Sequence, residues 1–146
     1  MIAWHYTTAQ CFRGIEETGG LLPSAPHMLD AEKPLLWFSV NQHWEQSARR
    51  GWTENGKRRL LSLEEMILHF GALYRFGMHE LRTAIGERQI RRLGRIRPGT
   101  WDQMIKNALA MGSDPNEWRA CSAFVPIGYV QVQVLKNLQT GWEPAR

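Results

Sequence analysis

The stretch IAWHYTTAQCFRGIEETGG, residues 2–20, predicts a strand followed directly by a helix. Ile2–Tyr6 is short, aromatic and β-prone, which is typical of a strand. Thr7 or Thr8 can cap a helix that runs to about Thr18, because the two glycines behind it end the helical pattern. One face of this helix carries the apolar side chains Cys11, Phe12 and Ile15. The chain therefore begins as a β–α unit whose helix has one face for a core.

The segments that follow alternate between connections and regular structure. Residues 23–34 contain three prolines and predict a loop. The compact apolar run Leu35–Val40 predicts a buried strand. Residues 41–48 are polar and compatible with a helix. Residues 49–59 (RRGWTENGKRR) are basic and contain glycine, so we expect a mobile connection there.

The middle of the chain carries a capping box. Ser62 and Glu65 stand three positions apart in front of an apolar run, which predicts a short helix. Leu73–Met78 (LYRFGM) predicts another strand. Residues 79–99 show no clear periodicity, and a Pro-Gly pair ends them.

The last third of the chain predicts one helix and two strands. Thr100 and Gln103 have the spacing of a capping box, and Gly112 can close the helix that follows. The apolar face of that helix holds Trp101, Met104, Ile105 and Ala108. Trp118–Val125 and Val130–Leu135 are separated by a turn and predict a late pair of strands. This order of elements predicts an α+β fold, in which helices flank a split or bent sheet that is rich in antiparallel pairs.

The composition is that of a single globular domain, residues 1–146. Apolar residues make up 43% and charged residues 22%, which excludes wholesale disorder. The sum of 18 Lys and Arg against 14 Asp and Glu gives a net charge of +4. A positive balance excludes a DNA mimic, which needs surplus carboxylates, and it permits anionic ligands such as nucleotides or nucleic acid. Seven tryptophans predict a core or pocket that is rich in indoles.

The sequence lacks the motifs of several other classes of protein. Cys11 and Cys121 form no C-x-x-C pair, which excludes a zinc ribbon and a thioredoxin-type site. We expect both to be reduced, packed thiols of a cytoplasmic protein, because no signal peptide or membrane span is visible. The histidines show no metal-ligand spacing, so we expect no metal. No dinucleotide-binding glycine motif, P-loop or nucleophile elbow is present.

Three short segments combine groups that suit nucleotide chemistry: His5–Thr7, Leu36–Ser39 and Asn116–Trp118. Each lies in or at the end of a predicted strand, so a sheet can bring them to one cleft. An imidazole can bond a ribose hydroxyl, an indole can stack on a nicotinamide ring, and a serine can bond a carboxamide. A carboxylate can bind a ribose 2′-hydroxyl and stabilise an oxocarbenium-like transition state.

These segments resemble the H-Y-E class of ADP-ribosyltransferases, the superfamily that includes poly(ADP-ribose) polymerases and small bacterial transferases. That family carries a His-Gly-Thr/Ser segment, a helix and a Gly-Leu step, where this chain has His5–Thr7 and Gly20-Leu21. The family continues with an aromatic-Phe-Ala/Ser segment, which matches Trp37–Ser39. It places its catalytic Glu before a late strand, which matches Asn116–Trp118. The sequence departs from the family where Tyr6 replaces glycine and Trp37 replaces tyrosine.

The resemblance implies an NAD-dependent ADP-ribosyltransferase with an ADP-ribosyltransferase-like fold. His5 would hold a ribose hydroxyl, and Trp37 would stack on nicotinamide. Glu117 would bond the 2′-hydroxyl of the nicotinamide ribose and favour cleavage of the C–N bond, after which a protein, nucleic acid or small-molecule acceptor attacks. The implied catalytic residues are His5 and Glu117, and those implied to bind NAD are His5, Tyr6, Thr7, Trp37, Ser39 and Ser47.

Other interpretations of the same residues stay open. An RNA 2′-phosphotransferase would share the NAD chemistry and use several arginines to grip phosphates. A non-catalytic phage or toxin-system inhibitor would keep the fold for binding alone, and Tyr6 in place of glycine favours it. Trp37 could be a core residue and Glu117 a solvated turn residue. Two basic clusters could contact NAD or nucleic acid, or form solvated faces: Arg49, Arg50, Lys57, Arg58 and Arg59, and Arg88, Arg91, Arg92, Arg95 and Arg97.

Overall fold

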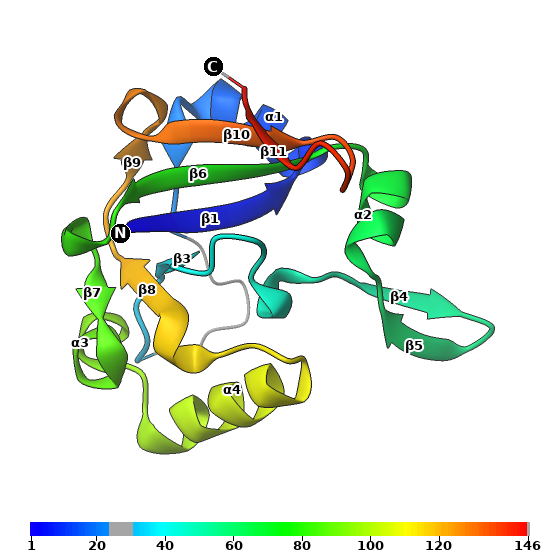
Figure 1. Ribbon diagram of the computed structural model, residues 1–146. Helices are drawn as coiled ribbons and strands as arrows, with labels where there is room; N and C mark the ends of the chain where they lie inside the picture. Colours follow the sequence, from blue (N-terminus) through cyan, green and yellow to red (C-terminus); the bar gives the residue numbers. More distant parts are fainter. Residues whose placement is uncertain (24–30, 146) are drawn as a thin grey trace.

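The computed structural model describes residues 1–23 and 31–145 and shows a mixed α and β fold around one seven-stranded antiparallel sheet (Figure 1). The strand order is β11-β10-β6-β1-β3-β8-β7. These strands are β1 (Ile2–Thr8), β3 (Leu36–Ser39), β6 (Leu73–His79), β7 (Ala84–Ile85), β8 (Trp118–Cys121), β10 (Gln131–Leu135) and β11 (Trp142–Pro144). The predicted α+β class and the antiparallel pairing are confirmed.

Two two-stranded ribbons, four α-helices and four short 3₁₀ turns complete the regular structure of the described chain. The 3₁₀ turns are Gln46–Ala48, Glu80–Arg82, Pro115–Glu117 and Ile127–Tyr129. β2 (Gly20–Leu21) pairs with β9 (Val125–Pro126), and β4 (Gly51–Glu54) pairs with β5 (Lys57–Leu60). The helices are α1 (Ala9–Thr18), α2 (Leu63–Phe70), α3 (Gly86–Gly94) and α4 (Pro98–Ala110). α1 packs against β1 and β6, α2 against β6, and α3 against β7 and β8. None of the helices in the described chain has the length and apolar character that crossing a membrane requires.

The sheet is weakly joined between β1 and β3. Seven residue pairs link β1 to β6, whereas Trp4 and Ser39 form the single registered pair between β1 and β3. Beyond that pair the two strands separate, and the remaining half of the sheet, β3-β8-β7, turns toward α3 and α4 (Figure 1). The pocket described below lies at this separation.

The local signals of the first β–α unit are confirmed. Thr8 caps α1, and its side chain accepts a hydrogen bond from the Cys11 amide. Gly19 ends the helix with a φ of 81°, the left-handed conformation that glycine adopts at little cost. Phe12 and Ile15 pack against the core, but Cys11 is exposed and not packed as expected.

The Ser62 capping box is also confirmed. The Ser62 hydroxyl accepts from the Glu65 amide, and the Glu65 carboxylate accepts from the Ser62 amide. The predicted cap at Thr100 is wrong, because α4 begins two residues earlier at Pro98. Proline at the first helical position loses no hydrogen bond, and its fixed φ suits the helix.

Two predictions about connections are wrong. Residues 49–59 contain most of the β4–β5 hairpin, in which Asn55 and Gly56 take φ values of 52° and 76°. Both angles suit a primed turn, which matches the twist of the strands and which an Asn-Gly pair favours. Residues 41–48 form bends and one short 3₁₀ turn, Gln46–Ala48, in place of a helix.

The prediction that the two late strands pair with each other is wrong, although both strands form. β8 pairs with β3 and β7, and β10 pairs with β6 and β11. The two strands therefore lie in opposite halves of the sheet, because β1, β3 and β6 stand between them. Part of the predicted loop at 23–34, residues 24–30, lies outside the described residues.

The core is divided by the sheet. Side chains on the α1 side include Ala3, Phe38, Phe76, Met78 and Val132. Those on the α2 side include Trp4, Tyr6, Trp44, Leu61, Met66 and Leu73. A third cluster under α3 and α4 includes Leu35, Ile90, Ile96, Trp101, Ala108 and Trp118. Four buried tryptophans in the last two clusters confirm the expectation of an indole-rich interior.

Candidate functional site

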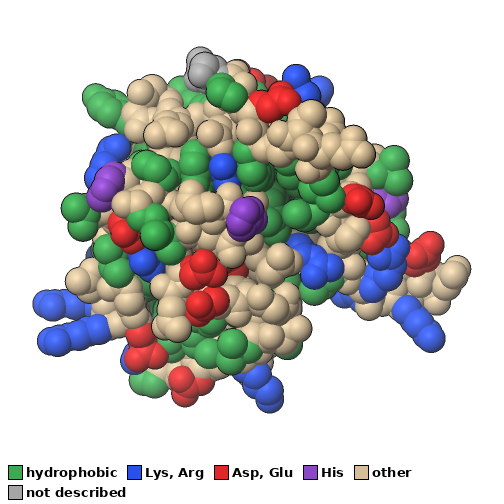
Figure 2. Space-filling model, viewed as in Figure 1, with side chains coloured by type: hydrophobic (Ala, Val, Ile, Leu, Met, Phe, Trp, Pro, Cys, Tyr) green, Lys and Arg blue, Asp and Glu red, His purple; other side chains and the backbone are tan. Residues whose placement is uncertain are grey.

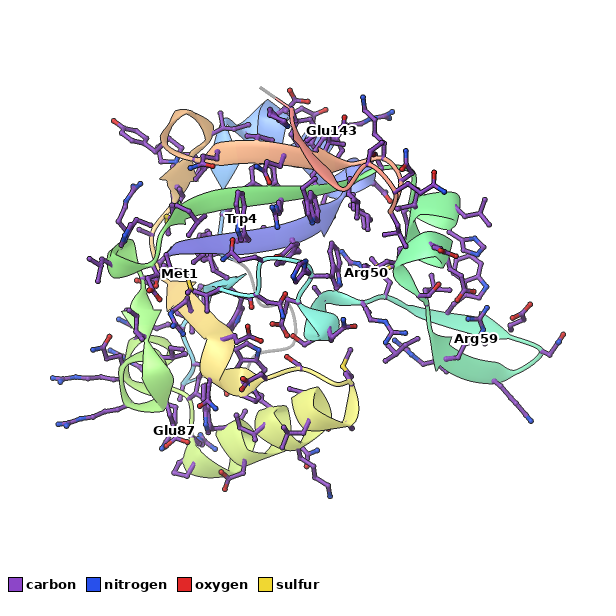
Figure 3. All side chains as sticks on the ribbon, viewed as in Figure 1. Met1, Trp4, Arg50, Arg59, Glu87 and Glu143 are labelled. Carbon is purple, nitrogen blue, oxygen red and sulfur yellow. The ribbon has the colours of Figure 1, made fainter. Side chains whose placement is uncertain are left out.

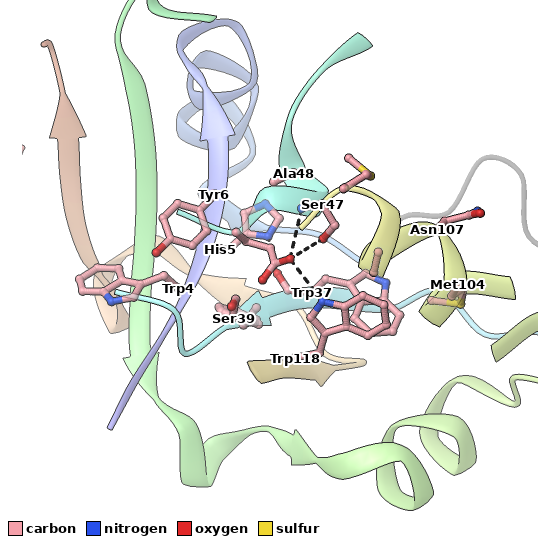
Figure 4. A pocket seen from close by; sticks show the side chains of 14 residues that line it. Trp4, His5, Tyr6, Trp37, Ser39, Ser47, Ala48, Met104, Asn107 and Trp118 are labelled. Carbon is pink, nitrogen blue, oxygen red and sulfur yellow. Dashed lines mark hydrogen bonds between the residues drawn. The ribbon is translucent and has the colours of Figure 1, made fainter. Parts of the chain in front are cut away.

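A pocket of about 430 Å³ opens where β1 and β3 separate (Figure 4). Its walls come from β1, β3, the segment before β4, and α4. The lining residues are Trp4, His5, Tyr6, Trp37, Phe38, Ser39, Glu45, Ser47, Ala48, Met104, Asn107, Ala108, Met111 and Trp118. The volume falls within the range of small-molecule sites, and the lining combines many apolar groups with a few polar ones.

A buried carboxylate, Glu45, stands in this pocket with 7% of its surface exposed. Its Oε1 atom accepts hydrogen bonds from the amide (3.2 Å) and the hydroxyl (2.7 Å) of Ser47 and from Nε1 of Trp118 (3.4 Å) (Figure 4). The hydroxyl of Ser113 donates to the same oxygen. Within the described chain, Oε2 has no hydrogen-bond partner. One oxygen therefore fixes the side chain, and the other is available to a ligand.

The His5 imidazole lines the same pocket as this carboxylate, and the backbone sets its tautomer. Nδ1 is 2.7 Å from the carbonyl oxygen of Trp37. A carbonyl oxygen accepts only, so Nδ1 carries the proton and Nε2 is the free acceptor of a neutral ring. Burial lowers the pKa of His5, and the nearby Arg50 guanidinium lowers it further against the opposing effect of the Trp37 bond. The ring is therefore neutral at pH 7.

The apolar wall of the pocket is built from indoles. Trp37 meets Trp118 edge to face with ring centroids 5.8 Å apart, and Trp118 meets Trp101 in the same way at 5.7 Å. Met104 and Met111 from the α4 side complete this wall. Trp37 is half-buried, so part of its ring is open to the pocket. A flat ligand ring can therefore find an indole surface here.

The Tyr6 side chain supports the wall and does not present its hydroxyl to a ligand. The phenol donates to the carbonyl oxygen of Asn41 and accepts from Nη1 of Arg75 at 3.4 Å. The Arg75 guanidinium is stacked between Trp4 and Trp142, 3.9 Å and 4.4 Å from their centroids. Burial raises the pKa of Tyr6 to about 12, although Arg75 acts in the opposite direction. The phenol stays protonated and fixed.

The structure brings together most of the residues that the sequence placed around NAD. His5, Tyr6, Trp37, Ser39 and Ser47 all line the pocket. Ser39 is buried, and its hydroxyl accepts from the Asn41 amide at 3.1 Å.

Thr7, which was placed with these residues, does not line the pocket. β1 continues to Thr8, and Thr7 stays paired with Tyr74 of β6 beyond the point where β3 turns away. The separation of the two strands therefore leaves Thr7 outside the site.

Glu117 also lies outside the pocket. Its carboxylate accepts from Nδ2 of Asn41 at 3.3 Å, and its carbonyl oxygen accepts from the Val40 amide at 2.9 Å. The next residue, Trp118, points into the pocket. Glu117 is the last residue of the short 3₁₀ turn Pro115–Glu117 that precedes β8, and its carboxylate is bound to Asn41 and does not line the pocket. The predicted carboxylate and the pocket carboxylate are therefore different residues.

Sequence reasoning missed Glu45 because its segment resembled a polar helix. A signal was present: Glu45 directly follows Trp44 and stands two residues before Ser47. A carboxylate next to a buried indole needs partners, and a serine two positions on can supply both an amide and a hydroxyl, as it does here. Ser113 follows α4 and stands 68 positions after Glu45, so no local sequence pattern could predict its hydrogen bond to this carboxylate.

No protein-family model matches this chain, and comparison with curated proteins and with solved structures gave no match either. The site is therefore interpreted from its own geometry.

Proposed function

We propose that the pocket binds the nicotinamide ribose end of NAD and that this protein transfers ADP-ribose from NAD to an acceptor. One observation carries the proposal: His5, Trp37 and the Glu45 carboxylate line a single pocket at the separation of β1 and β3. They supply a hydroxyl acceptor, a flat stacking surface and a buried anion. Cleavage of a glycosidic bond to a flat, electron-poor leaving group uses these three functions.

The binding residues have complementary tasks. Nε2 of His5 accepts a hydrogen bond from a ribose hydroxyl, because Nδ1 is already committed to the Trp37 carbonyl. The open part of the Trp37 ring stacks on nicotinamide. Ser39 lies at the β1–β3 pair, deep enough to meet the carboxamide. These contacts fix the ribose carbon that reacts.

Glu45 replaces Glu117 as the carboxylate of the proposed reaction. Four donor groups hold Oε1 in place, which pre-organises Oε2 without movement during the reaction. Oε2 accepts from the 2′-hydroxyl and stabilises the positive charge that develops on the ribose as the C–N bond to nicotinamide breaks. The apolar lining strengthens this interaction because it excludes water.

The diphosphate of NAD would lie at the rim. Among the described lining residues none is Lys or Arg, so the pocket itself suits the uncharged end of the dinucleotide. Arg50 follows two residues after Ala48, which lines the pocket, and its charge reaches His5 strongly enough to lower the pKa of that ring. Arg75 is held among Trp4, Tyr6 and Trp142, so Arg50 is the cation that we assign to the diphosphate.

The structure supports the alternatives less well. Removal of an RNA 2′-phosphate needs arginines around a phosphate, and the described pocket lining carries no cation. A non-catalytic binding protein has no need of a carboxylate held by four donor groups. Calorimetry with NAD tests this last alternative, because a non-catalytic binding protein is expected not to bind NAD.

Release of nicotinamide from NAD, with and without cell lysate, tests the proposal. We expect Glu45→Gln to lower the rate by about 10²–10³-fold, the loss typical of one charge-stabilising group. Glu117→Gln is the matched control, since it makes the same chemical change one residue outside the pocket. We expect its rate to stay within about twofold of wild type. Full activity of Glu45→Gln, or no release by the wild type in either condition, would overturn the proposal.

A further inference from the structure

The β4–β5 ribbon projects from the body of the molecule (Figure 1). In the described part of the chain its two strands pair with each other alone. The register sets Trp52 opposite Arg59 and Glu54 opposite Lys57. The ribbon starts at Gly51, three residues after Ala48 of the pocket lining. It is therefore an arm attached to the rim of the site.

One face of the ribbon is anchored on α2. The Trp52 ring stacks on His69 with centroids 4.4 Å apart. Arg59 forms ion pairs with Glu65 at 2.5 Å and with Glu54 at 3.4 Å. These contacts neutralise the charge of Arg59 and set the direction of the ribbon.

The other cations of the ribbon have no such partners. Lys57 and Arg58 are exposed, and no carboxylate of the described chain lies within ion-pair distance of either. Arg58 lies across Gly51, where a Cβ atom would come within 2.7 Å of its guanidinium. Arg50 stands at the base of the ribbon (Figure 3). Lys and Arg side chains gather around this arm in the space-filling view (Figure 2).

We propose that the ribbon, Gly51–Leu60, binds single-stranded nucleic acid and brings it to the pocket as the ADP-ribose acceptor; the acceptor role rests on the proposed function. Unpaired cations bind phosphates, and Trp52, which is 38% exposed, offers a ring to an unstacked base. An acidic peptide could use the cations but would leave the exposed indole unused. A duplex offers no unstacked base, so it would also leave the Trp52 ring without a partner.

The transfer is balanced without any further reactant. The bond between C1 of the ribose and the nicotinamide nitrogen breaks, and its electron pair leaves with neutral nicotinamide. A hydroxyl oxygen or an amine nitrogen of the nucleic acid bonds to the same carbon. The proton of that acceptor group passes to solvent.

Fluorescence anisotropy with a labelled oligonucleotide of about 20 nucleotides tests the binding without NAD, as RNA and as DNA. We expect both single strands to bind more tightly than the matching duplex. The double variant K57E/R58E should weaken binding at least tenfold and reduce the salt slope by about 1.4, the value for two lost phosphate contacts. Trp52→Ala should weaken binding at least fivefold, and Trp52→Phe, which keeps a ring on His69, should restore most of it.

The control R88E/R92E makes the same change of charge on α3, which is remote from the ribbon (Figure 1). We expect it to weaken binding less than threefold. Equal losses of oligonucleotide affinity in K57E/R58E and R88E/R92E would show that the net charge of the protein, and not the ribbon, attracts the oligonucleotide. That result would overturn the proposal. Absence of binding at about 50 mM salt, or a duplex that binds as tightly as the single strands, would also overturn it.

Transfer of labelled ADP-ribose to the oligonucleotide separates the two proposals. Glu45→Gln should bind the oligonucleotide normally and transfer nothing. K57E/R58E should release nicotinamide to water at the wild-type rate but lose transfer to the oligonucleotide. Binding without nicotinamide release would overturn the proposed function and leave the ribbon as a binding surface. Release without oligonucleotide binding would overturn the ribbon proposal and leave the enzyme.

Discussion

Nδ1 of His5 lies 2.7 Å from the carbonyl oxygen of Trp37, across the gap where β1 and β3 separate. This hydrogen bond joins the two halves of the sheet beyond their single registered residue pair, Trp4 with Ser39. It also decides the chemistry of the pocket, because it leaves Nε2 of a neutral imidazole as an acceptor. One contact therefore has a structural and a functional consequence.

The first prediction is a pH profile of nicotinamide release. Because burial lowers the pKa of His5 below its usual 6.5, the ring is still neutral at pH values somewhat below 6.5. We expect kcat/KM to stay level as the pH falls through 6.5 and to decline at a lower pH. His5→Gln, whose amide can still donate to the Trp37 carbonyl, should be less active and lack that decline. A decline already complete at pH 6.5 would contradict the assignment.

The same shift predicts a change of stability with pH. Below pH 6.5 the unfolded chain binds a proton at His5 before the folded chain does. The contribution of His5 to the free energy of unfolding is therefore fully present above 6.5 and is lost as the pH falls toward the folded pKa. Urea unfolding at a series of pH values measures this, and His5→Gln should flatten the slope in that window.

Glu45 should also contribute to stability through its four hydrogen-bond donors, one of which is the Ser47 amide. Glu45→Ala leaves the hydroxyls of Ser47 and Ser113 and the indole of Trp118 without their acceptor. We expect a loss of about 3 kcal/mol in the free energy of unfolding, since each unsatisfied buried donor costs about 1–3 kcal/mol. Glu45→Gln keeps an acceptor oxygen and should lose about half of that or less. Equal losses for both variants would show that the charge, and not the acceptor, stabilises the fold.

Trp37 should act on the affinity for NAD more than on the rate of the chemical step. Loss of an aromatic stacking partner costs about 0.5–1.5 kcal/mol, which corresponds to roughly 2–10-fold in affinity. Trp37→Ala should raise the KM for NAD by that factor, and Trp37→Phe, which keeps a flat ring, by less. Trp101→Phe is the control, because Trp101 is buried behind Trp118 and does not line the pocket. A Trp37→Ala enzyme with an unchanged KM would show that the indole is only a core residue.

Tyr6 should make the fold sensitive to strong alkali. The pKa of Tyr6 is raised by burial to about 12, above the value of about 10 for an exposed phenol. Between these values the folded chain keeps a proton that the unfolded chain loses, so the contribution of Tyr6 to stability declines as the pH rises from about 10 to about 12. Tyr6→Phe should be less sensitive over this range. Absorbance of the phenolate during a pH titration identifies the late-titrating tyrosine.

Much of the local structure could be predicted from the sequence because the signals are local. Thr8 and Gly19 bound α1, and Ser62 with Glu65 begins α2, each through hydrogen bonds within one turn of helix. The β4–β5 hairpin also had a local signal, Asn55-Gly56, but the surrounding basic residues hid it. Charge reports on the surface and says little about strand pairing.

The pairing of strands could not be predicted in the same way. β8 and β10 are neighbours in the sequence, yet three strands separate them in the sheet. Their partners are chosen by which apolar faces meet across the sheet, and that depends on segments far apart in the chain.

The sequence by itself determined the α+β class, both ends of α1, the start of α2, and the group of His5, Trp37, Ser39 and Ser47, because all of these follow from local patterns or short motifs. The tertiary structure decided which carboxylate enters the pocket. Glu117 ends the 3₁₀ turn before β8, and the amide of Asn41, 76 positions earlier in the chain, binds its carboxylate outside the pocket. Glu45 enters because Ser113 and Trp118, about 70 positions later in the chain, supply the donors that make its burial favourable.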